Sequence, residues 1–419
     1  MSRTNSTADG LSHGHEAEPA EGGLGPYSRR VRGLQSSAIR EILRVVHRPD
    51  VISLAGGLPA PELFPGALLA RASEELLAGP MRSKALQYGE TEGVPELRDR
   101  LARSSPFAGP LRAENVVVTH GSQQALDLLA KLFIDPGDEV LVETPAYVGA
   151  LQVFRFFGAR VTFVRCDRDG MVPEALAAAL ARSPKLCYLT PTFQNPSGAC
   201  TPERRRVEIR DVLGRSPRTL VVEDDPYREL WFEAAPPPPL VSGLDLGRAV
   251  YLGTFSKTAV PGLRIGYLLG PPALVRSCVL AKQATDLHTN TFGQHLILRL
   301  LEDPAFPSHV ATVRAAYRAR RDALDGALSA LARDRLEWQR PPGGMFLWAR
   351  LRSGGDAAEL LRLALHEGVA FVPGAEFHPP GEGRDTLRLN FTHGAEDRLG
   401  EGAARLERAL AASRTRSER

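Results

Sequence analysis

Four short polar segments follow apolar runs of the chain and carry the side chains most capable of chemistry. They are Thr-His-Gly-Ser-Gln-Gln at 119–124, Asn-Pro-Ser-Gly at 195–198, Glu-Asp-Asp-Pro-Tyr at 223–227 and Thr-Phe-Ser-Lys at 254–257. Lys257 is one of only five lysines among 52 basic residues, and Arg264 follows it seven positions later. A lysine amine can form a Schiff base with an aldehyde, so Lys257 is a candidate nucleophile.

The segment at 119–124 is a candidate anion site. Gly121, Ser122 and Gln123 come directly after an apolar run and open a predicted helix, where free backbone N–H groups bind anions. Each segment also has a plainer interpretation. Gly-Ser begins many helices, and an acidic residue such as Asp224 at a strand end often caps one.

Taken together, the segments match the needs of one aldehyde, pyridoxal phosphate. The 121–123 turn, Ser256 and Arg264 can cradle its phosphate. Asp224 can keep the pyridine nitrogen protonated, so that the ring withdraws electrons.

The remaining atoms of the cofactor also find candidate partners. Asn195 and Tyr227 can donate hydrogen bonds to the ring oxygen O3′. Tyr147, in Thr-Pro-Ala-Tyr, can cover the face of the ring. The segments therefore predict a single cofactor site.

The elements that must position these residues follow from the hydrophobic pattern. Short runs rich in β-branched residues alternate with helical stretches, which is typical of βαβ units. This pattern predicts a large α/β domain with a seven-stranded, mostly parallel sheet covered by helices on both faces. The seven runs are 116–119, 139–143, 160–164, 186–189, 220–223, 250–253 and 265–269.

A smaller α+β domain is expected after Pro304 and Pro307. It would comprise a long helix from Val310 to about Leu331 and strand-like segments at 343–349, 369–372 and 386–391. Arginines at 318, 320 and 321 could bind RNA, but a solvated helix face is favoured. The expected division is a disordered tail at 1–26, an N-terminal arm at 27–65, a large domain at 66–303 and a small C-terminal domain at 304–419.

Composition excludes several classes of protein. The net charge is only +3, which argues against a nucleic-acid partner. No window approaches the roughly 20 apolar residues that span a bilayer, and the N-terminus lacks an apolar signal region. None of the four cysteines forms a C-x-x-C pair, so no metal site is expected. The same cysteine pattern predicts a reduced, cytoplasmic location.

The assembled motifs resemble the fold-type I aminotransferases that depend on pyridoxal phosphate. Within class I and II of that family, the chain is most similar to the branch that holds 2-aminoadipate and kynurenine aminotransferases. The resemblance runs from about Ser37 to the C-terminus. S-L-A-G-G-L-P-A-P-E-L-F-P at 53–65 and L-Q-Y-G-E-T-E-G at 86–93 carry the likeness to this branch, beside the four segments above and P-P-G-G-M-F at 341–346.

The resemblance implies a role for each matching residue. Lys257 would bind the cofactor, and Arg388, in Leu-Arg-Leu-Asn-Phe, would bind the substrate α-carboxylate. Gly57 and Asn195 would also contact the substrate. The residues implied to hold the cofactor are Gly121, Ser122, Gln123, Tyr147, Asn195, Asp224, Tyr227, Ser256 and Arg264. The family is a homodimer with shared active sites, so Tyr88 would reach the partner's phosphate. Phe193 and Gln194 are less usual than the rest of the motif, and they are implied to face the substrate.

The predicted function is transfer of an amino group between an L-amino acid and a 2-oxo acid by a ping-pong mechanism, with glutamate and 2-oxoglutarate as one pair. Another reaction on the same fold stays open, such as that of a β-lyase, a decarboxylase or an oxidase. A regulator is a third possibility, because some winged-helix transcription factors carry a domain of this branch. Such a regulator needs an additional DNA-binding domain at its N-terminus. Only about 35 residues precede the region of resemblance here, which disfavours the regulator.

Arg40 is the candidate for substrate choice. It lies just before the Gly-rich loop at 55–57, and the matching arginine of the branch can pair with a distal carboxylate of the substrate. The alternative is a solvated arginine on a surface helix, and the sequence leaves both open.

Overall fold

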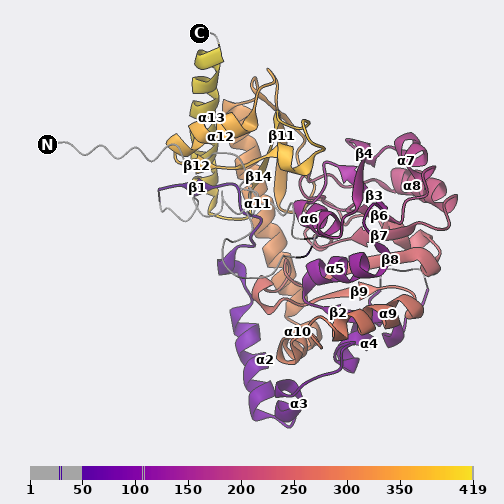
Figure 1. Ribbon diagram of the computed structural model, residues 1–419. Coiled ribbons are helices and arrows are strands. Elements are labelled where there is room, and N and C mark those ends of the chain that lie inside the picture. The colour runs from indigo at the N-terminus through magenta and orange to yellow at the C-terminus, as the bar shows by residue number, and fades with distance from the viewer. Residues whose placement is uncertain (1–27, 29, 31–49, 106, 108, 418–419) are drawn as a thin grey trace, which may run out of the picture.

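The computed structural model describes residues 28, 30, 50–105, 107 and 109–417. The predicted tail at 1–26 and Arg40 lie outside these residues. Figure 1 shows two lobes, one built on a large sheet and the other on a small C-terminal sheet.

The large sheet confirms all seven predicted strands and adds one. Its four central pairings, from β4 through to β8, are parallel, whereas β9 runs antiparallel to both of its neighbours. In spatial order the strands are β2 (Val116–Thr119), β9 (Gly266–Leu269), β8 (Ala249–Thr254), β7 (Leu220–Asp224), β6 (Leu186–Leu189), β3 (Glu139–Thr144), β4 (Arg160–Asp167) and β5 (Gly170–Met171). The prediction of seven strands missed β5, because two residues in a tight turn carry no period-two pattern.

Helices cover both faces of the large sheet, as predicted. Successive residues of a strand point to opposite faces, so Val116 and Val118 pack into one core and Val117 into the other. The first core receives α4 (Pro95–Arg103), α7 (Pro173–Leu180), α8 (Glu203–Gly214) and α10 (Thr291–Glu302). The second receives α5 (Gly121–Phe133), α6 (Val148–Phe156) and α9 (Pro272–Gln283).

The C-terminal lobe packs three helices around a four-stranded antiparallel sheet. The strand order is β10 (Leu336–Trp338), β11 (Phe346–Leu351), β14 (Thr386–Asn390) and β13 (Val372–Pro373). The helices are α11 (Phe306–Leu331), α12 (Ala357–His366) and α13 (Glu396–Ser417). β1 (Ile52–Ser53) pairs with β12 (Val369–Ala370), so the segment before the large sheet belongs structurally to this lobe.

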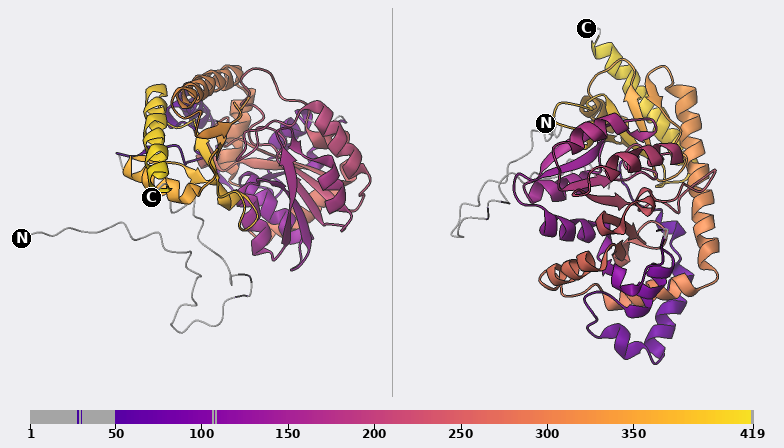
Figure 2. Two further views of the ribbon diagram at one scale, coloured as in Figure 1. Left: turned by 90° about the horizontal axis from the view of Figure 1, so that it is seen from above. Right: turned by 90° about the vertical axis from the view of Figure 1, so that its right-hand side faces the viewer.

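The long helix α11 departs from its prediction in two ways. It begins at Phe306 rather than Val310, because Pro307 lies in the first turn, where no N–H donor is needed. The prediction of a solvated arginine face is wrong for two of its members. Arg320 pairs with Glu62, and Arg321 is 1% exposed and donates to the Pro341 carbonyl. The right-hand view of Figure 2 shows α11 along most of the length of the molecule.

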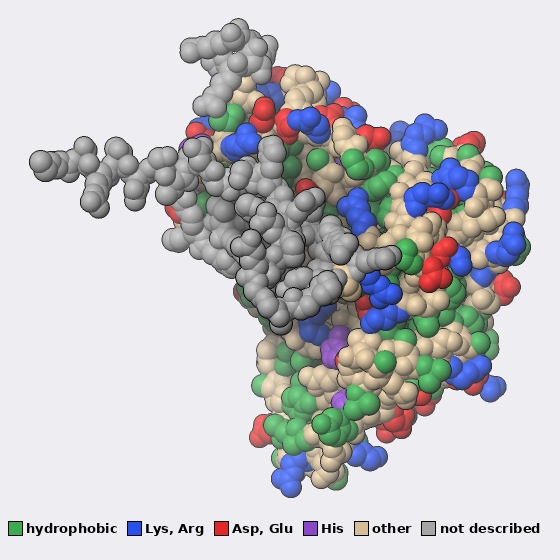
Figure 3. All heavy atoms as spheres, viewed as in Figure 1, with side chains coloured by type: hydrophobic (Ala, Val, Ile, Leu, Met, Phe, Trp, Pro, Cys, Tyr) green, Lys and Arg blue, Asp and Glu red, His purple; other side chains and the backbone are tan. Residues whose placement is uncertain are grey.

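The remaining helices are short or peripheral. α2 (Gly66–Ala78) and α3 (Arg82–Leu86) lie at the bottom of Figure 1, away from the small sheet. The 3₁₀ turns are η2 (Pro61–Leu63), η3 (Ala113–Asn115), η4 (Leu240–Gly243), η5 (Leu246–Arg248), η6 (Pro261–Leu263) and η7 (Gly374–Phe377). Figure 3 shows basic and acidic side chains interspersed on one face, in keeping with the small net charge. Within the described residues, no helix is long and apolar enough to cross a membrane.

Candidate active site

The carboxyl ends of β2, β3, β6, β7 and β8 meet at one edge of the large sheet, as the ends of strands pointing the same way must. A cavity of about 390 Å³ lies there, closed on the other side by residues of the C-terminal lobe and of the segment after β1. Twelve of the predicted site residues line it: Gly57, Gly121, Ser122, Gln123, Tyr147, Asn195, Asp224, Tyr227, Ser256, Lys257, Arg264 and Arg388.

Lys257 follows β8, and its amine reaches across the cavity. Nζ donates to the carbonyl oxygen of Gly57 at 3.2 Å. Burial, helped by the positive charges of Arg264 and Arg388, lowers the pKa of Lys257 to about 8. A larger share of this amine is therefore neutral near pH 7 than for an ordinary lysine, and only the neutral amine is nucleophilic.

Asp224 ends β7 and is 2% exposed. Its Oδ2 accepts a hydrogen bond from the Tyr188 hydroxyl at 3.0 Å, while its buried Oδ1 has no partner. Burial raises the pKa of Asp224 to about 7, although the bond from Tyr188 opposes the shift. An unpaired, buried carboxylate oxygen is costly, so this atom fits a cationic donor such as a protonated ring nitrogen.

The start of α5 and Arg264 form a cradle for an anion. Gly121, the first residue of α5, has φ +72°, and a Cβ there would lie 2.8 Å from Nη2 of Arg264. Arg264 itself is left-handed, with φ +56°, and its Nη1 lies 3.4 Å from Oγ of Ser256. Ser122 Oγ is buried and makes no hydrogen bond of ordinary geometry, although it lies close enough to Asp224 to lower the pKa of that carboxyl. A phosphate fits these free donors and the helix N-terminus.

Arg388 projects from β14 and is 4% exposed. It donates to Oδ1 of Asn195 at 2.7 Å and to the carbonyl of Ala55 at 3.0 Å, and its buried Nε has no partner. The guanidinium lies 4.2 Å from the ring centre of Phe346. Burial lowers the pKa of Arg388 to about 10. No carboxylate among the described residues neutralises this cation, which suits it to a substrate anion.

The chain matches one known family over most of its length. The family described as "Aminotransferase class I and II" matches residues 50–406. The chain belongs to this family. It is therefore a transferase enzyme that depends on pyridoxal phosphate, as the resemblance implied.

Two curated relatives and one solved structure are similar over nearly the whole chain. Aromatic-amino-acid aminotransferase 1 of Thermococcus litoralis is 39% identical, over 91% of this chain and 93% of the relative. The 2-aminoadipate transaminase of Thermus thermophilus is 43% identical, over 90% and 94%. The crystal structure of an alpha-aminoadipate aminotransferase from Thermus thermophilus, complexed with N-(5′-phosphopyridoxyl)-L-leucine, has a TM-score of 0.85 at 41% identity, covering 92% of this chain and 97% of that one. These neighbours confirm the fold-type I prediction.

One described residue that was predicted to bind the cofactor, Tyr88, does not line the cavity. Tyr88 is 78% exposed and makes an edge-to-face contact with His288, with ring centres 5.6 Å apart. Arg40 lies outside the described residues. Gln123 lines the cavity, but its side chain donates to the Gly149 carbonyl at 3.1 Å, so its backbone N–H in the first turn of α5 is the group suited to an anion.

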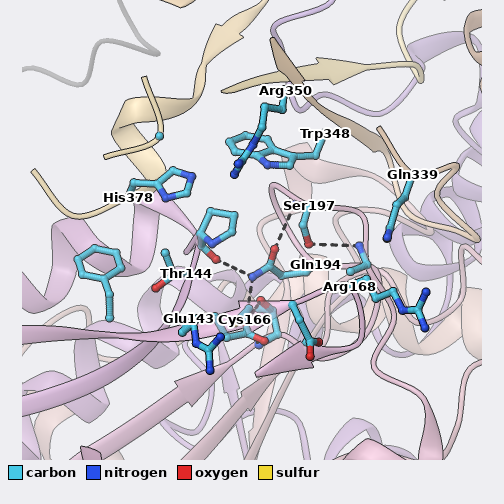
Figure 4. Close-up of a pocket in the computed structure, with 18 of the residues that line it drawn as sticks. Glu143, Thr144, Cys166, Arg168, Gln194, Ser197, Gln339, Trp348, Arg350 and His378 are labelled. Carbon is cyan, nitrogen blue, oxygen red and sulfur yellow. Dashed lines mark hydrogen bonds between the residues drawn. The ribbon is translucent and has the colours of Figure 1, made fainter. Parts of the chain in front are cut away.

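The expectation that Phe193 and Gln194 face the substrate is wrong. Phe193 is 1% exposed and packs against Gly343 and Gly344. Gln194 faces a separate cavity of about 880 Å³ between the two lobes, shown in Figure 4. Neither lines the cavity with Lys257.

Sequence reasoning overlooked Tyr188 in the aminotransferase site. It is a buried residue of β6 that lines the cavity and bonds to Asp224. An aromatic residue in a strand normally indicates core packing, so no local signal distinguishes it. The described residues contain no cluster of three or more His, Cys, Asp or Glu side chains that could hold a metal ion.

Proposed function

We propose that this aminotransferase moves an amino group between an L-amino acid and a 2-oxo acid in two half-reactions at the cavity, with glutamate and 2-oxoglutarate as one pair. The observation that carries the proposal is that one cavity brings together Lys257, an unpaired Asp224 oxygen and Arg388, which pairs with no carboxylate among the described residues. When bound, pyridoxal phosphate supplies an aldehyde that takes up the amino group and a ring that withdraws electrons from the substrate Cα.

The residues divide the remaining work. Arg388 would bind the α-carboxylate, with its unpaired Nε–H available as a donor, and this contact would orient the Cα–H bond toward Lys257. Lys257 would move the proton to and from the substrate Cα as general base and acid. Asp224 would hold the pyridoxal phosphate ring nitrogen in its protonated form, Asn195 and Tyr227 would donate to its ring oxygen, and Tyr147 would cover the face of the ring.

An ion pair between Arg388 and the substrate α-carboxylate favours transamination over decarboxylation, because it stabilises the carboxylate against loss as CO₂. No observation favours a β-lyase or an oxidase. The test is a panel of amino acids mixed singly with the enzyme, followed by a panel of 2-oxo acids. Reversible conversion of the cofactor absorbance in both directions supports the proposal, whereas release of CO₂, or release of free ammonia in place of transfer of the amino group to the second acid, contradicts it.

The substrate class is proposed from the relatives' names and the cavity. Apolar side chains of Leu58, Pro59, Val148 and Phe346 line part of it. We therefore propose an aromatic amino acid or 2-aminoadipate as the second amino donor.

Replacement of Arg40 by alanine tests how acidic substrates are selected. If Arg40 pairs with a distal carboxylate, Arg40→Ala should lower kcat/KM for glutamate and 2-aminoadipate by roughly ten- to hundredfold, the value of a charged hydrogen bond of about 1.5–3 kcal/mol. Leucine and phenylalanine should be almost unaffected. Equal losses for acidic and apolar donors would assign Arg40 a structural role.

We also propose a homodimer in which Tyr88 contacts the phosphate bound by the partner. The support is the exposure of Tyr88 and of nearby Leu86, which is 61% exposed. A cytoplasmic location is proposed as well, since none of the four cysteines is disulfide-bonded. Cell fractionation tests the location.

Tyr88→Phe should weaken cofactor binding by roughly tenfold or more, because one hydrogen bond to a charged phosphate is lost. The sharper measurement mixes this variant with Lys257→Ala. If Tyr88 serves the partner's site, each hybrid dimer contains one site with both residues intact, and cofactor affinity and activity return there. If Tyr88 serves its own chain, or if the protein is a monomer, mixing restores nothing.

A further inference from the structure

The side-chain amide of Gln194 joins two loops at the edge of the large sheet. Nε2 donates to Oε2 of Glu143 at 3.2 Å and to the carbonyl of Pro145 at 2.7 Å, and Oε1 accepts from the backbone N–H of Ser197 at 3.1 Å. Figure 4 shows these three bonds. Gln194 is 5% exposed. The two hydrogens of its buried amide are bound by Glu143 and by the Pro145 carbonyl.

Glu143 anchors the far side of this arrangement. It lies near the end of β3 and is 4% exposed. Besides Gln194, its Oε2 accepts from the backbone N–H of Thr190 at 2.8 Å and from the Thr190 hydroxyl at 2.9 Å. Three donors thus meet one carboxylate oxygen, and they join the end of β3 to the segment that follows β6.

The two joined loops both continue into the cavity. Pro145 is two residues before Tyr147, and Gln194 directly precedes Asn195. Asn195 in turn accepts the hydrogen bond from Arg388 and lies 3.5 Å from the Tyr227 hydroxyl. Gln194 itself does not line the cavity, so any effect on chemistry must pass through its neighbours.

We propose that Gln194, held by Glu143, is a positioning residue that sets Asn195 and Tyr147 relative to the cofactor. This inference rests on the proposed function, because it assigns these two neighbours to O3′ and to the ring face. Without the amide, Glu143 loses one of its three donors and the carbonyl of Pro145 loses its bond to Gln194, so the two loops are joined only through Glu143 and Thr190. A shift of Asn195 by a fraction of an ångström would alter both its contact with O3′ and its grip on Arg388.

The test compares Gln194→Met, which keeps the side-chain length without the donors, with a matched control. Asn115→Leu also removes a buried amide that joins two segments, through the Gly270 carbonyl and the Arg112 N–H, but at the opposite edge of the sheet. Both variants should lower the unfolding temperature. Only Gln194→Met should lower kcat, by roughly ten- to hundredfold. Only Gln194→Met should shift the pH midpoint of the lysine-bound cofactor absorbance, by about half a pH unit or more.

Two further variants keep the proposal testable. Gln194→Asn retains the amide on a shorter side chain and replaces Gln194→Met if that protein does not fold. Glu143→Gln keeps an acceptor oxygen, so its absorbance midpoint should lie between those of the native enzyme and Gln194→Met. An unchanged midpoint in both Gln194 variants would overturn the proposal, as would equal loss of kcat in Asn115→Leu. If the native enzyme itself shows no lysine-bound cofactor band, the proposed function fails instead.

Discussion

Lys257→Ala is expected to lower turnover by roughly four orders of magnitude, because one amine both binds the cofactor and moves the proton. Cofactor affinity should also fall, since the covalent link is lost while the phosphate cradle remains. Borohydride reduction of the native enzyme followed by peptide mapping gives the direct measurement. The label is expected on the peptide that contains Lys257.

Two other lysines provide the controls for this result. Lys131 forms an ion pair with Asp127 on the outer side of α5, and Lys282 is buried against Asp286. Lys131→Ala should retain turnover and labelling, because its amine lies outside the cavity. A borohydride label on Lys131 or Lys282 would contradict the role of Lys257.

Asp224→Asn is expected to lower kcat by roughly a hundred- to thousandfold with little change in substrate affinity, because the ring nitrogen loses its anionic partner only as charge develops at Cα. Stability should change in the opposite direction. The pKa of Asp224 is raised to about 7 in the folded chain, so the unfolded chain releases this proton first as pH rises from about 4 to about 7. Stability of the cofactor-free protein therefore falls across this window, and asparagine avoids the loss.

The measurement is the unfolding free energy of both cofactor-free proteins between pH 4 and pH 8. Above pH 7 the Asp224→Asn variant should be the more stable, and the difference should vanish toward pH 4. Single-turnover rates complete the test. A variant that loses stability at pH 8 together with activity would show that Asp224 holds the fold rather than the cofactor.

The sequence could predict that the site residues lie together, because most of them directly follow a predicted strand. Lys257, Asp224 and Asn195 each follow an apolar run, and parallel strands present such positions at a common edge. Arg388 could be identified only by resemblance, since its strand belongs to a different sheet. The resemblance of Leu-Arg-Leu-Asn-Phe to the family motif therefore identified Arg388, which the spacing of apolar residues could not do.

The supporting contacts were not predictable, because they depend on which strands are neighbours. Tyr188 reaches Asp224 because β6 and β7 are adjacent, with Tyr188 in register with Val222. Glu143 reaches Thr190 because β3 flanks β6 on its other side. Sequence order places β3 three strands before β6, so the pattern along the chain does not reveal this pairing.

The pairing of β1 with β12 has a consequence for how the protein is made. Ile52 is synthesised long before its partner Val369. The segment that follows β1 supplies the carbonyl oxygens that accept from Lys257 and Arg388, so these acceptors have no fixed place until β12 has been made. Contacts this distant in sequence also slow folding. A nascent chain can thus form much of its large sheet, but it acquires a complete cofactor cavity only once the C-terminal lobe has been made.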